Sequence, residues 1–119
     1  MFYDAIENKH GLKHDPYKAI VAPRPIGWIS SLDRDGTPNL APYSFFNGVS
    51  DRPHVVMFSS AGRKDSILNI EATGEFVCNL ATWDLREQMN MSSASVPPGV
   101  NEFTLAGLTE APHPMFAVP

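Results

Sequence analysis

Two apolar-rich segments near the start of the chain have the pattern of a β-hairpin. Residues 26–32 (IGWISSL) carry β-branched and aromatic side chains, which favour a strand. An Asp-Gly dipeptide typical of tight hairpin turns follows, and residues 39–46 (NLAPYSFF) form the returning segment. Pro42 within that segment indicates a bulge or an unpaired strand edge. The pattern therefore predicts two antiparallel strands over residues 26–46.

Two further strands are predicted downstream. Residues 47–53 have the composition of a loop, and residues 54–60 (HVVMFSS) that of a buried strand. Residues 75–81 (EFVCNLA) alternate in the manner of a strand, with Cys78 on its apolar face. That placement predicts a buried, unreactive thiol at this position.

Helical patterns occupy two stretches. Residues 64–73 (KDSILNIEAT) predict a helix, with Asp65 or Ser66 as N-cap and Gly74 as its stop. The apolar side of this helix is expected to comprise Ile67, Leu68 and Ile70. Residues 84–91 predict a second, short helix.

The remaining segments complete a single predicted domain over residues 1–119. Residues 1–15 are expected to form an arm, and the proline-rich residues 16–25 an extended segment, with an edge strand over 19–22. On the C-terminal side, residues 92–101 are predicted to form a flexible loop and residues 102–109 one more strand or a short helix. Residues 109–119 are predicted to form an irregular tail.

Composition narrows the class of protein. The chain is 43% hydrophobic with a net charge of −4, so neither nucleic acid nor an acidic membrane surface is an expected partner. No apolar run is long enough to span a bilayer, and the N-terminus lacks the pattern of a signal peptide. A lone cysteine excludes an internal disulfide and agrees with the cytoplasm, which is the expected location.

The stretch before the first helix has the composition of an anion site. Ser59 and Ser60 precede Arg63 and Lys64, and Ser66 follows at the helix start. Free backbone N–H groups and the positive end of the helix dipole favour a phosphate at such a place. A strand platform leading into this site suggests a phosphorylated cofactor.

Several residues permit two interpretations. Arg24, held between two prolines, is either a surface arginine on a stiff loop or a cation fixed beside an anionic ligand. Tyr43, Phe45 and Phe46 either belong to the core or wall a flat ligand. Asn47-Gly48 is either a simple turn or a turn whose amide side chain meets a ligand.

Taken in order, these motifs resemble the flavin reductase-like proteins, a family that includes flavoredoxin-type electron carriers and the small reductases of two-component monooxygenases. The likeness covers residues 16–108. It implies a mainly β fold with short helices (α+β), arranged as an antiparallel split β-barrel of the FMN-binding type.

The resemblance also implies which residues would bind FMN. The stretch that would lie against the flavin ring comprises Ser44, Phe45, Phe46 and Asn47. The stretch that would hold the phosphate comprises Ser59, Ser60, Arg63, Lys64, Asp65 and Ser66. The same cleft would be lined by Arg24 and Trp28, and the loop over residues 92–101 would lie near the flavin face.

The function implied is hydride transfer from NAD(P)H to bound FMN, followed by electron transfer to a small-molecule or protein acceptor. The flavin carries this chemistry, so no catalytic side chain and no metal is expected. The family is usually homodimeric, with each flavin near the interface. The alternatives are a flavin-binding electron carrier without a nicotinamide site and a truncated, non-catalytic split-barrel module.

One departure from the family pattern concerns the C-terminus. Similar domains continue through several further strands, whereas this chain ends at Pro119, and HPMFAVP does not resemble the next family segment. The expectation is an incomplete barrel, either because the chain is a fragment or because a partner chain supplies the missing edge.

Overall fold

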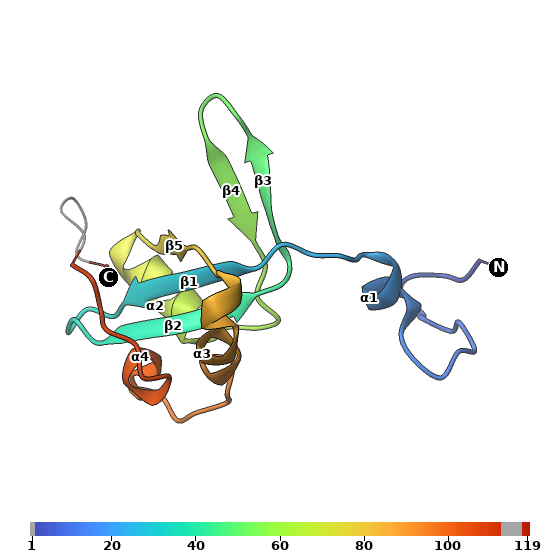
Figure 1. Ribbon diagram of the computed structural model, residues 1–119. Helices are drawn as coiled ribbons and strands as arrows, with labels where there is room; N and C mark the ends of the chain where they lie inside the picture. The colour runs from blue at the N-terminus through green and yellow to red at the C-terminus, as the bar shows by residue number, and fades with distance from the viewer. Residues whose placement is uncertain (1, 113–117) are drawn as a thin grey trace.

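The segment rich in β-branched and aromatic residues forms the central strand of the fold. In the computed structural model, which describes residues 2–112 and 118–119, β1 (Gly27–Leu32) pairs antiparallel with β2 (Pro38–Tyr43) and β5 (Val77–Asn79) (Figure 1). Both strands predicted over residues 26–46 are confirmed, but the second ends at Tyr43. Because β1 is central, both of its edges are paired, and its side chains are buried on both faces.

A separate hairpin comprises β3 (Phe46–Ser50) and β4 (Val55–Phe58), with a bulge between Gly48 and Ser50. The predicted loop over 47–53 is therefore wrong for its first four residues. The predicted strand over 54–60 is present but not buried, since Val56 and Met57 are 42% and 54% exposed. The hairpin projects from the body of the molecule (Figure 1), and its residues are exposed except at its base, where Phe46 and Phe58 are half-buried.

The main helix is α2 (Asp65–Thr73), which ends at Gly74 in the left-handed conformation, as predicted. Its N-cap is Lys64 rather than Asp65 or Ser66, because Lys64 is still extended and the helix begins at the next residue. The predicted apolar side is also wrong. The buried residues of α2 are Ser66 and Asn69, and Leu68 is 45% exposed.

Three short helices follow, namely η1 (Trp83–Leu85), α3 (Arg86–Met91) and α4 (Glu102–Leu105). They cover the face of the sheet opposite α2. The core of this layer is Trp28 on β1, Leu40 on β2 and Phe103 on α4, with Leu85 and Met89 packed against it. The short helix over 84–91 is thus confirmed, and the segment from residue 102 begins as a helix rather than a strand.

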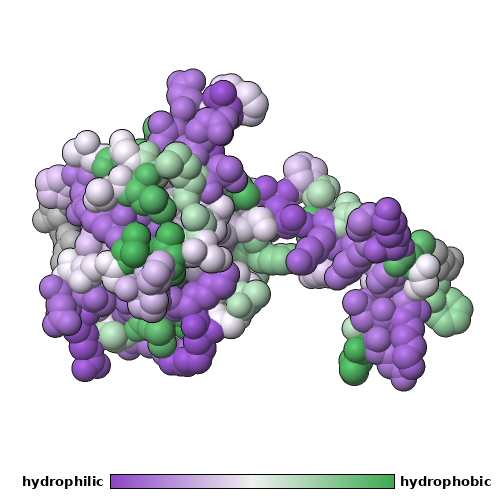
Figure 2. Space-filling model, turned by 90° about the horizontal axis from the view of Figure 1, so that it is seen from below, coloured by the Kyte–Doolittle hydropathy of each residue, from purple (hydrophilic) through white to green (hydrophobic). Residues whose placement is uncertain are grey.

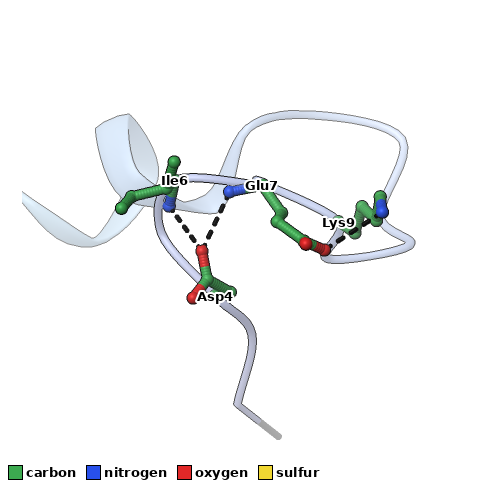
Figure 3. A network of polar contacts seen from close by, with 4 residues as sticks. All are labelled: Asp4, Ile6, Glu7 and Lys9. Carbon is green, nitrogen blue, oxygen red and sulfur yellow. Dashed lines mark hydrogen bonds and ion pairs between the residues drawn. The ribbon is translucent and has the colours of Figure 1, made fainter.

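The N-terminal segment stands away from this body (Figure 1). In the arm, the Asp4 carboxylate accepts hydrogen bonds from the backbone N–H groups of Ile6 and Glu7, and Lys9 pairs with Glu7 (Figure 3). The segment expected to be extended instead forms α1 (Pro16–Ile20). Asp15 caps its first turn and proline suits the first helical position, and together these outweigh the surrounding prolines.

Large apolar side chains are exposed beside β5, where Leu80 is 81% and Trp83 78% exposed. Cys78 is exposed as well, so the predicted buried thiol is wrong. Seen from the side of α3 and α4, apolar surface lies among the polar groups of the body (Figure 2). Within the described part of the chain, no helix is long and apolar enough to cross a membrane.

The end of the chain returns to the sheet. Val118 is fully buried, and the Pro119 carbonyl accepts a hydrogen bond from the Ser30 hydroxyl. Residues 109–112 form no helix or strand, as predicted for the tail. The predicted irregular conformation of residues 113–117 lies outside the described residues.

Candidate functional site

A cavity of about 300 Å³ lies along the outer edge of β2. It is bounded by β2, by the start of α2, and by the loop between α3 and α4. Its lining residues are Asn39, Ala41, Pro42, Tyr43, Lys64, Asp65, Ser66, Ser92, Ser93, Ala94, Ser95, Val96, Pro98 and Glu102. Small-molecule sites typically enclose about 300–1,000 Å³, so this volume suits a ligand or part of one.

The start of α2 borders the cavity without a side-chain cap, and the third N–H group of the helix, that of Ile67, donates to the Lys64 carbonyl at 2.9 Å. Lys64 occupies the N-cap with φ −98° and ψ 172°, and it makes no side-chain capping hydrogen bond. The first N–H groups of a helix have no partner within the helix, and the helix dipole gives this end partial positive charge. Asp65 and Ser66 both line the cavity. The arrangement is suited to an anion.

The two adjacent cations do not share this site. Lys64 lines the cavity, whereas Arg63 forms a two-pronged ion pair with Glu71, one hydrogen bond being 2.9 Å from Nη1 to Oε1. This pair lies on the exposed side of α2. Arg63 is therefore engaged elsewhere, and Lys64 is the cation of the cavity wall within the described residues.

At the other side of the cavity, the Glu102 side chain hydrogen-bonds to the outer edge of β2, which no other strand pairs with among the described residues. Its Oε2 accepts a hydrogen bond of 3.1 Å from the Leu40 backbone N–H, and the residue is 5% exposed. Burial raises the pKa of this carboxyl group above the ordinary value of 4.5, and the hydrogen bond from Leu40 opposes the shift. Nothing in the local sequence indicated this role, because Leu40 is distant along the chain.

The loop over residues 92–101 lines the cavity with residues 92–96 and Pro98, and its predicted position near a flavin stays a prediction. It is anchored where it begins. The Ser92 hydroxyl accepts a 2.9 Å hydrogen bond from Trp28 Nε1 and donates one of 2.8 Å to the Met89 carbonyl. Trp28, expected in the ligand cleft, thus lies in the core, where it supports this loop.

The residues expected beside a flavin ring gather at a second place, next to the cavity. The Ser59 backbone N–H donates to the Phe45 carbonyl at 2.9 Å, which extends the ladder between β3 and β4 by one pair, and Ser59, predicted for the phosphate, does not line the cavity. Phe46 lies against Gly27 so closely that any side chain there would overlap its ring. Asn47 is exposed in β3, opposite Met57, so the predicted turn at this point is wrong. Ser44 lies between this group and Tyr43, which lines the cavity.

Arg24 and Ser60 make local contacts. Arg24 Nη1 donates to the carbonyls of Lys18 and Val21 at 2.8 and 3.0 Å, and its guanidinium lies 5.3 Å from the centroid of Phe45. The Ser60 hydroxyl donates to the Gly62 carbonyl at 2.9 Å. Neither residue lines the cavity, and their part in ligand binding stays a prediction.

Tyr43, for which the sequence left a core role and a ligand-wall role open, lines the cavity, and so does Asn39, which sequence analysis missed. Tyr43 is 7% exposed, and its hydroxyl has no hydrogen-bond partner among the described residues. An unpaired buried hydroxyl is costly, so a ligand that reaches it gains a ready partner. Asn39 is 8% exposed and donates a 2.8 Å hydrogen bond to the Ser66 hydroxyl.

Comparison with known proteins identifies the family. The model of the flavin reductase like domain matches residues 21–119, which is most of the chain. The chain belongs to the flavin reductase-like family. An uncharacterised protein of Aquifex aeolicus is 46% identical over 95 residues, covering 76% of this chain and 48% of its own length.

Solved structures agree with this family and with the split-barrel fold. Nitrilotriacetate monooxygenase component B from Bacillus cereus matches with a TM-score of 0.85 and 29% identity, over 100% of this chain and 61% of that chain. A Shewanella frigidimarina protein with a split barrel domain has a TM-score of 0.79 and 21% identity, over 100% and 62%. This flavin reductase-like chain spans about half the length of the curated relatives it matches.

The raised pKa of Glu102 predicts how stability depends on pH. The folded state binds this proton more tightly than the unfolded chain, so the stabilisation is full below the ordinary value of 4.5 and is lost as pH rises through the folded pKa. Glu102→Gln keeps an oxygen acceptor for Leu40 and removes the charge. We expect the Glu102→Gln variant to lack the fall in stability with rising pH that the wild type shows. At neutral pH the variant should therefore unfold at a higher urea concentration than the wild type.

The measurement is urea unfolding at a series of pH values that rises from below 4.5 to neutral. Glu87→Gln, on the exposed side of α3, is the matched control. The control should retain the wild-type pH profile. A Glu102→Gln variant with the wild-type profile would show that the carboxyl group is not perturbed by its burial.

Proposed function

We propose that the cavity at the start of α2 holds the phosphate of FMN, and that the chain forms the flavin-binding part of a flavin reductase. The observation that carries this proposal is the uncapped start of α2 with Lys64, Asp65 and Ser66 in the cavity wall. Family membership supports a flavin as the ligand.

The donor set fits a phosphate monoester. Backbone N–H groups, the Lys64 ammonium and the Ser66 hydroxyl all donate hydrogen bonds, and phosphate oxygens only accept them at their charged positions. The neighbouring Tyr43 hydroxyl is a further unpaired group. Beyond the phosphate, the flavin ring would lie toward Ser44 and Phe45, where the two hairpins meet.

A bound flavin supplies the atom that accepts hydride, and this is the chemistry that the chain itself lacks. The contribution of the protein is to bind the phosphate, orient the ring and limit access of water. In this proposal the loop over residues 92–101 covers one side of the ligand, held by Ser92 against Trp28. NADH or NADPH is the proposed electron donor.

The proposed partner is a second copy of the chain, with a small molecule or another protein as electron acceptor. Exposed apolar side chains at Leu80, Trp83 and Met57 support association, since monomers rarely expose large apolar groups together. Sedimentation at micromolar concentration measures this, and a folded monomer would contradict it.

The phosphate contact predicts a difference between two neighbouring cations. Lys64→Ala should weaken FMN binding about tenfold, because a charge-assisted contact is lost, and should leave riboflavin binding unchanged. Arg63→Ala is the matched control, since Arg63 is paired with Glu71 outside the cavity. Both ligands are titrated by quenching of flavin fluorescence. Equal losses in the two variants, or equal affinity of wild type for both ligands, would refute the phosphate site.

Hydride transfer is tested separately from flavin binding. The protein loaded with FMN is mixed anaerobically with NADH or NADPH, and loss of the visible flavin absorbance is followed with free FMN as the control. We expect bleaching much faster than in the control with at least one nucleotide. FMN that binds but is not reduced faster than in the control would favour an electron carrier without a nicotinamide site.

A further inference from the structure

Helix α2 is held against the sheet by two buried pairs of the same chemical kind. Asn39 Nδ2 on β2 donates to Ser66 Oγ at 2.8 Å, and Asn69 Nδ2 donates to Ser31 Oγ on β1 at 3.2 Å. All four residues are at most 8% exposed. Because the fully buried residues of α2 are polar, directional hydrogen bonds contribute to the position of this helix beside the half-buried Ile67 and Ile70.

The two pairs differ in their relation to the cavity. Asn39 and Ser66 both line it, whereas Ser31 and Asn69 do not. Ser66 is the second residue of α2, beside the uncapped backbone N–H groups. The second pair is nearly one helical turn further on. Asn69 lines a smaller adjoining cavity of about 120 Å³, which shares Asn39 with the first, so the second pair supports the same helix without lining the proposed phosphate site.

The hydrogen bond from Asn39 also determines whether the Ser66 hydroxyl acts as a donor or as an acceptor toward the cavity. A hydroxyl group has one proton to donate and two lone pairs that accept. Asn39 occupies a lone pair, and within residues 2–112 and 118–119 the Ser66 proton has no acceptor. The oxygen is therefore held with its acceptor side toward Asn39, and its proton is left for a group in the cavity.

We propose that Asn39 is a positioning residue that fixes the Ser66 hydroxyl as a donor to an anionic oxygen in the cavity. This inference rests on the proposed phosphate site. Asn39 does not itself bind the anion; it orients a group that does. A hydroxyl that already accepts a hydrogen bond is polarised and becomes a stronger donor, which adds to the effect of orientation.

The test compares FMN with riboflavin, which lacks the phosphate, in wild type, Asn39→Ala and the matched control Asn69→Ala. Both variants lose a buried Asn–Ser hydrogen bond beneath α2. A purely structural effect should therefore weaken the binding of FMN and of riboflavin in both variants. Positioning predicts that Asn39→Ala lowers the preference for FMN over riboflavin about tenfold and that Asn69→Ala preserves it. Melting temperatures establish that each protein is folded at the titration temperature.

Two further variants keep the test decisive. Asn39→Leu restores most of the lost volume without a donor, and it should lose the same preference even if Asn39→Ala does not fold. Ser66→Ala should have a similar effect, and combining it with the Asn39 variant should add little, because both act on the same contact.

The outcomes distinguish a failure of the positioning role of Asn39 from a failure of the proposed phosphate site. A wild-type preference for FMN that survives in both Asn39 variants, or that falls equally in Asn69→Ala, overturns the positioning role alone. A wild-type protein with no preference for FMN overturns the phosphate site and this inference together.

Discussion

Helix α2 begins without a side-chain cap, and the candidate site depends on this helix start. Lys64 is the N-cap residue, and its side chain has no acceptor with which to cap a helix. Donors at a helix start need an acceptor from water or a ligand. Here they border a cavity together with a cation and a hydroxyl group. The site is thus a consequence of where the helix begins.

The carboxyl groups of Asp65 and Glu102 line the cavity beside its hydrogen-bond donors. Glu102 is directed at the Leu40 N–H, where it completes the outer edge of β2. Burial raises its pKa, which lowers its tendency to carry charge. Arg63 and Glu71 neutralise each other on the far side of α2. Asp65 also lines the cavity, and its charge adds to the raised pKa of Glu102, so Lys64 and the helix dipole act on the cavity against this carboxylate.

Sequence reasoning succeeded where local chemistry decides the structure. The β-branched and aromatic residues of β1 and the glycine after α2 have strong conformational preferences, and both were predicted correctly. The region around the helix start was predicted to be an anion site because serines, cations and a helix pattern coincide there. Three of its residues and part of the loop over residues 92–101 line the cavity, and their role in binding stays a prediction.

Sequence reasoning failed where the environment of a residue depends on segments that are distant along the chain. Asn47-Gly48 has the composition of a turn but is held in a strand by pairing with β4. Cys78 alternates as a buried residue should and pairs with the buried Ile29, yet it is exposed because β5 lies at the edge of the sheet. The contacts of Glu102 and Asn39 cross from one part of the chain to another, so no local pattern contains them.

The account is tested most directly at the amide groups that begin α2. Two-dimensional ¹H–¹⁵N spectra of the labelled protein, recorded with FMN and with riboflavin, report on Asp65 and Ser66 individually. A phosphate at the helix start predicts large amide shifts at both residues with FMN and small ones with riboflavin. Shifts of equal size with the two ligands, or unchanged amides at saturating FMN, would contradict the claim that this helix binds the phosphate.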